Sequence, residues 1–212
     1  MISEGEAHQC QMRLDQEVEG GISNEPLENP DLTLYVDGSR RYINGQFWTG
    51  WAVADQNEEA ILKGGLEGTL SVQIAELIAL TESLKAAKGK RVNMYTDSRY
   101  AFGVVHDYMA AWNRRNFITS GGGHIRHEKV VQELVEAARV PAEVAVIKIQ
   151  AHRKVENQQQ RGNMLADAVA KEAAEKEEPR IVRVAAYSPE EMNVQKLQGY
   201  RSRGEGATLG KD

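Results

Sequence analysis

Cysteine is almost absent from this chain of 212 residues, which contains only Cys10. A single cysteine excludes an internal disulfide and suits a reducing compartment. His8 lies two residues before it, but no second pair of Cys or His residues has the spacing of a zinc site. We therefore expect no zinc centre and assign no function to Cys10.

Long hydrophobic runs are absent as well. No stretch reaches the roughly 18 apolar residues that suggest a membrane-spanning helix, and no basic-then-apolar leader opens the sequence. The hydrophobic fraction of 41% and the charged fraction of 27% are typical of a soluble globular protein. At this length we expect one domain of ordinary size with tails, and neither a membrane span nor a secretory signal.

Negative charge is concentrated at one end of the chain. The net charge is −5, but residues 1–31 contain eight acidic residues and one arginine, whereas the remainder contains 25 basic and 23 acidic residues. If four of those 23 acids were covered by metal, the rest of that surface would be basic. The overall sign of the charge therefore does not exclude a nucleic-acid partner.

The apolar pattern predicts alternating strands and helices. Period-two alternation predicts strands at 32–39, 50–55, 60–66, 91–96 and 143–150. Helical spacing predicts helices at 71–88, from residue 98, at 108–116, at 127–140 and at 161–175. The first three strands form an antiparallel meander, and the strand–helix–strand order of the second half implies parallel pairing. The predicted class is therefore α/β with a mixed sheet.

Four acidic residues occupy comparable positions along this pattern. Asp37 and Asp97 each end a predicted strand in the same phase. If those strands are neighbours, both carboxylates lie beyond the same edge of the sheet, where ligands gather in open parallel sheets. Glu76 and Asp167 lie on predicted helices, and the simplest partner for four converging carboxylates is a divalent metal.

Each of the two helical acids shares its helix face with an amide. Gln73 precedes Glu76 by three residues, and Asn163 precedes Asp167 by four. Hard oxygen ligands favour magnesium or manganese over zinc. Taken singly, each acid also has a structural explanation, because Glu76 can pair with a nearby lysine and Asp97 can cap a helix.

Five motifs follow one another in the chain: YVDGS at 35–39, AELIAL at 75–80, YTDSRYAF at 95–102, AHRK at 151–154 and RGNMLADAVAKEAA at 161–174. Together they resemble the ribonuclease H domain of a retroviral reverse transcriptase, most closely that of a gammaretrovirus or an endogenous retrovirus. The resemblance covers Leu32 to about Glu175. It is specific because several spaced motifs occur in the right order.

The resemblance implies a ribonuclease H-like fold, with a five-stranded mixed sheet in the order 3-2-1-4-5 flanked by helices. It implies an endonuclease that hydrolyses the RNA strand of RNA:DNA hybrids during reverse transcription, leaving a 5′-phosphate and a 3′-hydroxyl. Asp37 would bridge two Mg²⁺ ions, for which Mn²⁺ can substitute, Asp167 would hold the ion that activates water, and Glu76 and Asp97 the ion beside the leaving oxygen. His152 matches a histidine that helps proton transfer or product release, although a lone loop histidine is often simply solvated.

The resemblance also indicates which residues would contact the hybrid. Gln73 and Asn163 resemble amides that reach the RNA 2′-hydroxyl, and Ser71 and Tyr100 resemble contacts to the DNA strand. Further predicted contacts lie in the turn after Asp37, in the region of a basic protrusion and in the loop after His152: Gly38, Ser39, Trp112, Arg114, Arg115 and Arg153. The alternative is that the tryptophan packs in the core and the arginines are solvated.

The same resemblance divides the chain into three parts. Residues 1–31 would be an acidic flexible linker that ends a connection region, 32–178 the ribonuclease H domain, and 179–212 a flexible C-terminal linker toward an integrase. The expected partners are therefore the hybrid, the polymerase and connection domains of a reverse transcriptase, and an integrase downstream in a polyprotein, without a membrane. The expected location is the cytoplasm, either of the host or of a virion core, with the nucleus left open.

Two other hypotheses stand beside the nuclease. A domesticated module could bind hybrids without cutting them, and the loss of any carboxylate would favour it, but all four are present. An integrase-like or transposase-like core shares the fold, but it requires a different acidic triad and fits the DSRYAF and RGN motifs poorly. The loop RKVENQQQ after His152 also departs from the family, because it has no glycine where relatives often have one.

Overall fold

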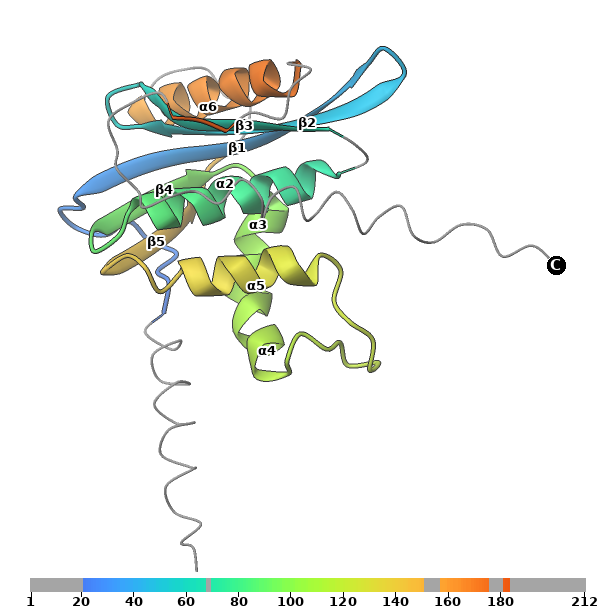
Figure 1. The fold of residues 1–212 in the computed structure, drawn as a ribbon. Coiled ribbons are helices and arrows are strands. Elements are labelled where there is room, and N and C mark those ends of the chain that lie inside the picture. The colour runs from blue at the N-terminus through green and yellow to red at the C-terminus, as the bar shows by residue number, and fades with distance from the viewer. Residues whose placement is uncertain (1–20, 68–69, 151–156, 176–180, 184–212) are drawn as a thin grey trace, which may run out of the picture.

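The computed structural model describes residues 21–67, 70–150, 157–175 and 181–183. Its strands form one mixed sheet in the order β5-β4-β1-β2-β3-β6 (Figure 1). The strands are β1 (Leu32–Ile43), β2 (Gln46–Asp55), β3 (Ala60–Glu67), β4 (Arg91–Thr96), β5 (Glu143–Lys148) and β6 (Ile181–Arg183).

The strand directions agree with the sequence pattern. β1, β2 and β3 form an antiparallel meander, and β4 and β5 run parallel to β1. The predicted order 3-2-1-4-5 and the α/β class are therefore confirmed. β6 adds an antiparallel strand to the free edge of β3, in a segment for which the sequence predicted no strand.

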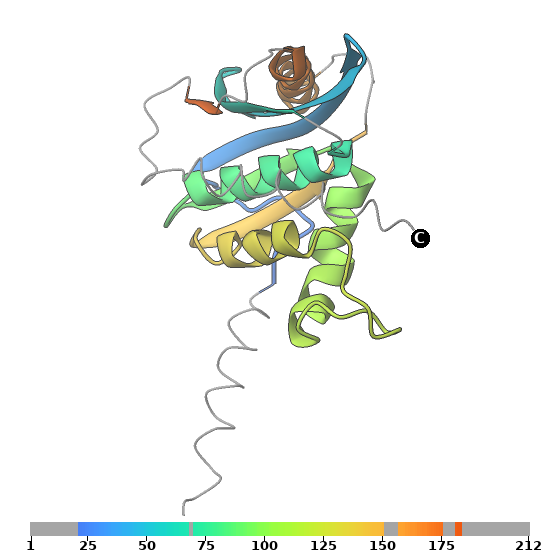
Figure 2. The same ribbon diagram turned by 45° about the vertical axis from the view of Figure 1, so that its right-hand side comes forward.

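Helices cover both faces of the sheet. They are α2 (Val72–Ala86), α3 (Arg99–Gly103), the π-helical turn η1 (Val104–Tyr108), α4 (Met109–Arg114), α5 (Glu128–Ala137) and α6 (Gln158–Glu175). α6 lies on one face, whereas α2 lies on the other with α5 packed against it (Figure 2). No helix in the described part of the chain is long and apolar enough to cross a membrane.

Alternation along β1 assigns its residues to the two faces. Leu34 and Val36 belong to the large core cluster beneath α2. Tyr35 belongs instead to the cluster on the α6 side, where it packs with Ala166. Because side chains alternate along a strand, Asp37 has the phase of Tyr35 and lies on the α6 side.

α2 is buried on nearly all sides, because it packs against both β1 and α5. Its core residues extend from Ile74 to Leu84 and include the polar side chains of Thr81, Glu82 and Ser83. A helix that is apolar around most of its circumference is expected in such a position. α2 is therefore a fixed platform for the residues at its start.

The chain before β1 lies against the outer strands. Ser23 N donates to Val144 O at 3.0 Å, and Val146 N donates to Ser23 O at 2.9 Å, so Ser23 covers the free edge of β5. The Asn93 side chain both accepts from Leu27 N at 2.8 Å and donates to Leu27 O at 3.3 Å. Residues 23–31, expected to be part of a flexible linker, are thus hydrogen-bonded to the sheet.

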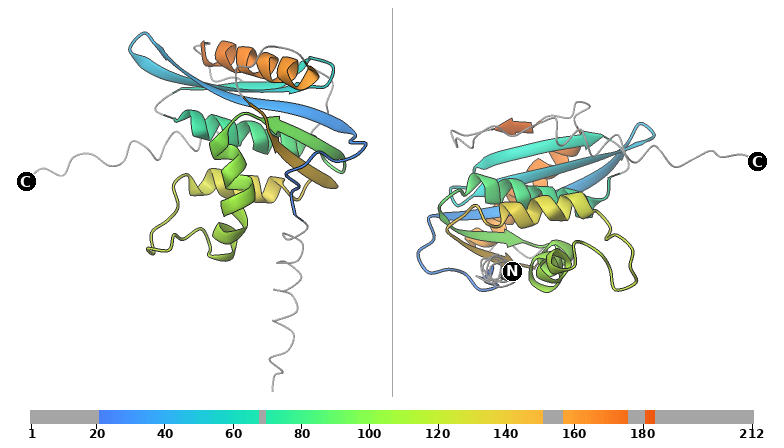
Figure 3. Two further views of the ribbon diagram at one scale, coloured as in Figure 1. Left: turned by 180° about the vertical axis from the view of Figure 1, so that it is seen from behind. Right: turned by 60° about the horizontal axis from the view of Figure 1, so that its bottom comes forward.

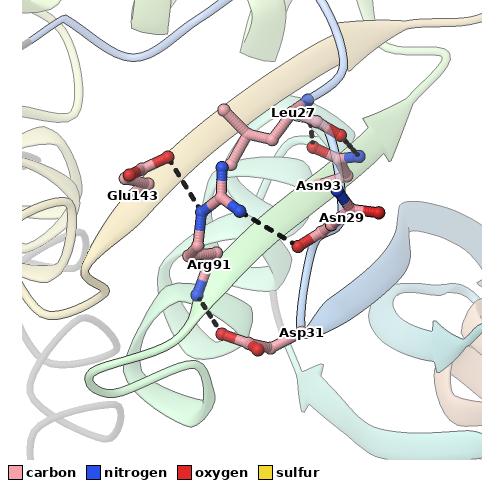
Figure 4. Close-up of polar contacts among 6 residues, drawn as sticks. All are labelled: Leu27, Asn29, Asp31, Arg91, Asn93 and Glu143. Carbon is pink, nitrogen blue, oxygen red and sulfur yellow. Dashed lines mark hydrogen bonds and ion pairs between the residues drawn. The ribbon is translucent and has the colours of Figure 1, made fainter.

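Arg91 completes this contact (Figure 4). Its backbone N donates to Asp31 Oδ2 at 2.8 Å, its Nη1 donates to Asn29 O at 3.1 Å, and its Nε donates to Glu143 Oε2 at 3.1 Å. We call residues 23–31 together with Arg91, Asn93 and Glu143 the N-terminal clasp. The clasp lies at the start of β4, at the opposite end of that strand from Asp97.

Candidate active site

Asp37 and Asp97 are brought together by the pairing of two parallel strands. Val36 of β1 is paired with Thr96 of β4, and the two aspartates are the next residues along each strand. They therefore emerge side by side at one edge of the sheet, as the sequence predicted. Asp37 is buried, with 7% of its surface exposed.

Glu76 reaches this edge because α2 packs directly against β1. A Cβ added at Gly38 would lie 2.7 Å from Glu76 N and 2.9 Å from Ala75 Cβ, which is closer than real Cβ atoms approach. Only glycine therefore permits this contact between strand and helix. Gly38 therefore has a packing role beside Asp37, and its predicted substrate contact stays a prediction.

Asp167 is brought to the site by α6. Asn163, one helical turn earlier, donates from Nδ2 to Asp97 Oδ2 at 3.1 Å. Residues four apart lie on the same face of a helix, so Asp167 lies on the face that meets Asp97. Small buried residues such as Ala166 and Ala170 let this helix approach the sheet closely.

The pKa of Asp37 reflects its burial and the charges of the other three carboxylates. Burial raises the pKa of Asp37 from its ordinary value of 3.8 to about 8, with further increases from the charges of Asp97, Asp167 and Glu76 and an opposing contribution from the Gly38 backbone N–H. Burial also raises the pKa of Glu76, and Asp97 adds to that increase. Mutual repulsion of this kind arises when several acids share a site.

Each of the other three carboxylates is engaged by a neighbouring side chain. Glu76 accepts a short hydrogen bond from Ser98 Oγ, Asp97 Oδ2 accepts one from Asn163 Nδ2, and Asp167 Oδ2 lies 2.6 Å from Lys171 Nζ. Among the described residues, no three His, Cys, Asp or Glu side chains are arranged as a metal-binding group. The predicted acids are therefore gathered in one place without forming a ready coordination shell.

The donor chemistry nevertheless fits a hard divalent cation. Asp37 is buried among three other carboxylates and carries a pKa of about 8, so a cation would relieve its repulsion. Carboxylate oxygens are the ligands preferred by Mg²⁺ and Mn²⁺. Glu76 and Asp167 would exchange their contacts to Ser98 and Lys171 for such an ion.

Several predicted substrate contacts border this site. Ser39 is buried on the same strand as Asp37. Ser71 Oγ and Asn163 Oδ1 are both shielded from solvent and have no hydrogen-bond partner. Gln73 is half-buried in the first turn of α2. Unpartnered buried polar atoms are uncommon in folded proteins, and a missing ligand is one accepted explanation for them.

Tyr100 lies beside the acids and beside a basic residue. Burial raises the pKa of its hydroxyl, Arg126 lowers it, and Glu76 raises it. Tyr100 is therefore influenced by both Glu76 and Arg126. Its predicted contact with the DNA strand stays a prediction.

The predicted basic protrusion contains one partly buried ring and two exposed arginines, and its contact with nucleic acid stays a prediction. Trp112 packs against the core but also stacks on Tyr108, with ring centroids 5.2 Å apart and an interplanar angle of 18°. Arg114 and Arg115 are exposed. His152 and Arg153 lie outside the described residues.

Two residues that orient the acids were missed by the sequence analysis. Ser98 was interpreted only as the start of a helix, and its Oγ does accept from Ala101 N at 3.0 Å, but it also binds Glu76. No sequence spacing links Ser98 to Glu76. Lys171 follows Asp167 by four residues, and this helical spacing was a signal that could have identified the pair.

Comparison with known proteins agrees with the motifs. A family model described as RNase H matches residues 29–175. The Gag-Pol polyprotein of Feline leukemia virus is 39% identical over 175 residues, which are 81% of this chain and 10% of that protein. The Pol polyprotein of Radiation murine leukemia virus (strain Kaplan) is 40% identical over 158 residues, 74% of this chain and 27% of that protein. The resemblance to the ribonuclease H domain of gammaretroviral Pol proteins is confirmed, and the chain spans only about a tenth to a quarter of these relatives.

Solved structures show the same fold. The native protease-reverse transcriptase of Prototype Foamy Virus has a TM-score of 0.63 at 18% identity, over 74% of this chain and 23% of that one. The solution structure of the PFV RNase H domain has a TM-score of 0.56 at 19% identity, over 69% of this chain and 96% of that one. The foamy viral protease-reverse transcriptase in complex with RNA/DNA hybrid has a TM-score of 0.57 at 16% identity, over 73% and 22% of the two chains. The predicted ribonuclease H-like fold is thereby confirmed.

Proposed function

The chain belongs to the RNase H family, and we propose that it hydrolyses the RNA strand of RNA:DNA hybrids with two Mg²⁺ ions. The observation that carries this proposal is Asp37, a buried aspartate whose pKa is raised to about 8 by burial and by three surrounding carboxylates. A fold alone would not require such a costly group of charges.

The four acids would hold the metal in the arrangement that the family resemblance implies. Asp37 would bridge the two sites, Asp167 would serve the side of the attacking water, and Glu76 and Asp97 the side of the leaving oxygen. Bound Mg²⁺ would supply a hydroxide nucleophile at neutral pH and stabilise the departing oxygen. His152 would assist proton transfer or product release.

Residues bordering the acids would select and position the hybrid. Asn163 Oδ1, which has no partner, and Gln73 would reach the 2′-hydroxyls that distinguish RNA from DNA. Ser71 Oγ, also unpartnered, and Tyr100 would contact the DNA strand. These assignments are consistent with a structural neighbour that was solved with an RNA/DNA hybrid.

The protrusion and the flanking loops would hold the phosphate backbone. Arg114 and Arg115 are exposed beside the stacked ring of Trp112, a combination that suits nucleic-acid backbones. Arg153 would extend the basic rim, and Ser39 would contact the RNA next to Asp37.

The wider context is part of the same proposal. The chain spans 10% and 27% of the first two curated relatives, which are Gag-Pol and Pol polyproteins. We propose that it acts in reverse transcription beside polymerase and connection domains, with an integrase after residues 179–212, in the host cytoplasm or a virion core.

A second candidate is a module that binds hybrids without cutting them. It is favoured by one observation, namely that no three acidic or histidine side chains among the described residues form a metal-binding group. The two candidates differ in one measurable property, which is Mg²⁺-dependent cleavage.

The deciding experiment uses labelled RNA:DNA hybrid, duplex RNA and duplex DNA, each with and without Mg²⁺. We expect cleavage of the RNA in the hybrid alone, and its loss in Asp37→Asn with binding to the hybrid largely retained. Glu172→Gln is the matched control, because Glu172 is an acid on α6 whose partner is Lys63. Equal cleavage by wild type and Asp37→Asn would contradict the metal assignment, and wild-type binding without cleavage would favour the second candidate.

A further inference from the structure

The hairpin formed by β1 and β2 carries an exposed aromatic pair at its tip. Tyr42 and Phe47 are directly opposite in the register, with 66% and 40% of their surfaces exposed. Their ring centroids lie 4.9 Å apart, and the guanidinium carbon of Arg40 lies 3.7 Å from the centre of the Phe47 ring. We call Arg40, Tyr42 and Phe47 the hairpin cluster.

The backbone holds this cluster in a fixed position. Asn44 and Gly45 occupy the turn with φ values of 50° and 83°. Left-handed residues at both central positions are the geometry that favours a tight two-residue hairpin, and Asn-Gly is its preferred sequence. The two rings are therefore held on a two-stranded hairpin outside the core. Exposed aromatic surface of this kind often marks a binding site.

The cluster is continuous with the start of α2. Arg40 and Tyr42 have the phase of Gly38, on the face of β1 that meets α2. Arg40 is paired with Thr49, whose Oγ1 donates to Leu70 O at 3.0 Å, next to Ser71. The surface thus leads from the residue proposed to contact the DNA strand to the exposed rings.

The hairpin tip and the loop that follows α4 project from the same side of the molecule in opposite views (Figures 1 and 3). Tyr42 lies five residues after Asp37 along β1, which corresponds to about 16 Å at the rise of a strand, or to about five nucleotides at about 3.4 Å each. The cluster lies on the face of β1 that meets α2, whereas Asp37 lies on the α6 side. The cluster would therefore meet the DNA strand that Ser71 is proposed to contact, and not the RNA strand at the acids.

We propose that the hairpin cluster binds the DNA strand where it continues as a single strand beyond the hybrid, an inference that rests on the proposed function. The Tyr42 ring offers a stacking surface, and a single strand exposes base faces that a duplex covers. Arg40 adds a positive charge for the adjacent phosphate. An acidic or apolar protein surface is the alternative occupant that the experiment must distinguish.

The experiment measures binding of the full chain by fluorescence anisotropy in chelator, where cleavage does not interfere. The probes are a short blunt RNA:DNA hybrid and the same hybrid with a single-stranded extension of DNA or of RNA, placed at either end in separate probes. We expect a DNA extension at one end to tighten wild-type binding. Tyr42→Ala combined with Phe47→Ala should weaken binding of that probe about fivefold or more and leave the blunt probe unchanged.

Matched variants separate stacking from general effects. Tyr42→Phe keeps the ring and should bind as wild type does. Arg40→Ala should weaken binding of the extended probe and reduce its salt dependence by about one phosphate contact. Arg139→Ala removes a positive charge from an exposed residue near the start of β4 and should change nothing.

Four outcomes would overturn the inference. Three of them are no gain from a DNA extension, a gain confined to RNA extensions, and an equal loss on blunt and extended probes, which would indicate a duplex contact. The fourth is unchanged DNA binding in the double variant, which would leave a protein as the occupant. Cleavage of the blunt hybrid in Mg²⁺ is scored separately, so failure of the proposed function is distinguishable from failure of the hairpin assignment.

Discussion

The two ends of β4 carry polar clusters that differ in how well their groups are compensated. At its start, Asn93 makes two hydrogen bonds with the Leu27 backbone, and Arg91 pairs with Glu143 and with backbone and side-chain oxygens of the clasp. At its end, Asp97 joins three other acids, and the pKa of Asp37 rises to about 8.

This difference indicates that the clasp contributes to stability, whereas the cluster of four acids is suited to binding a ligand. In the clasp each polar atom named has a partner within the chain, which is how a folded protein gains from buried polarity. Among the acids, repulsion remains, and it lowers the free energy of unfolding. Such uncompensated charge is found preferentially at functional sites.

The largest expected effect is on activity, at the end of β4. Asp97→Asn should reduce the cleavage rate of a hybrid in Mg²⁺ about a thousandfold or more, because a ligand of the metal would be lost. Its amide oxygen can still accept from Asn163, so the free energy of unfolding in chelator should not fall. Single-turnover cleavage and urea denaturation measure the two quantities, and a variant that cleaves normally would remove Asp97 from the site.

Asn93, four residues before Asp97, is expected to affect stability and not activity. Asn93 is buried and bonds to both polar groups of the Leu27 backbone, so Asn93→Ala should lower the free energy of unfolding by about 2 kcal/mol. The cleavage rate per folded molecule should be unchanged. Urea denaturation checks the first expectation, and a comparable loss of rate would show that the two ends of β4 are not separable.

Asn93→Asp provides the control for this prediction. A carboxylate can accept from Leu27 N but cannot donate to Leu27 O, so only one of the two hydrogen bonds is retained. Because Asn93 is buried, the new charge also costs desolvation and faces the Leu27 carbonyl oxygen, so the free energy of unfolding at neutral pH is expected well below that of wild type and no higher than that of Asn93→Ala. A value equal to that of wild type would mean that the second hydrogen bond contributes nothing.

Asp37→Asn should raise the free energy of unfolding, whereas Asn93→Ala should lower it. Because the folded-state pKa of about 8 exceeds the ordinary 3.8, the folded chain favours the protonated carboxyl, and that stabilisation is lost as pH rises from about 4 through 8. The neutral amide escapes this loss. In chelator, the variant should therefore be more stable than wild type by about 1 kcal/mol or more at pH 8, with a smaller difference at pH 5. Thermal or urea unfolding at both pH values measures this, and a variant less stable at pH 8 would contradict the repulsion.

The acid end was predictable from sequence because its residues follow local patterns. Asp37 and Asp97 continue the alternation of their strands, and Glu76 and Asp167 lie at regular helical positions. The partner of Asp167 was also available, since Lys171 is four residues away. Ser98 was not, because its contact with Glu76 depends on how α2 meets the end of β4.

The clasp and the extra strand were not predictable for a different reason. The extra strand attaches to the edge of β3 through backbone hydrogen bonds, which leave no pattern in side chains. The clasp combines backbone hydrogen bonds to β5 with side-chain contacts of Arg91 and Asn93, which lie more than 60 residues from their partners Asn29 and Leu27 in the sequence. Residues 23–31 are polar and acidic, and their composition therefore indicated a linker. The extension of β1 to Ile43 did have a signal, the Asn44–Gly45 pair, which marks a tight hairpin turn.

The smallest expected effect concerns Lys171, whose ammonium group forms an ion pair with Asp167. Lys171 Nζ is 2.6 Å from Asp167 Oδ2, but 39% of the lysine side chain is exposed, so the pair should contribute less than about 0.5 kcal/mol to stability. A metal ion would compete with Lys171 for the same oxygen. Lys171→Gln should therefore lower the Mg²⁺ concentration for half-maximal cleavage by about twofold, with little change in the maximal rate.

Lys63→Gln is the matched control. Lys63 pairs at 3.5 Å with Glu172, which lies on α6 as Lys171 does but is not a proposed metal ligand. Mg²⁺ titrations of the two variants measure the effect of charge at the two positions. If the control shifts the titration as much as Lys171→Gln does, the change reflects general charge on α6. A shift confined to Lys171→Gln would mean that the ammonium group of Lys171 partly neutralises the four acids in the absence of metal, and that the metal ion displaces it from Asp167.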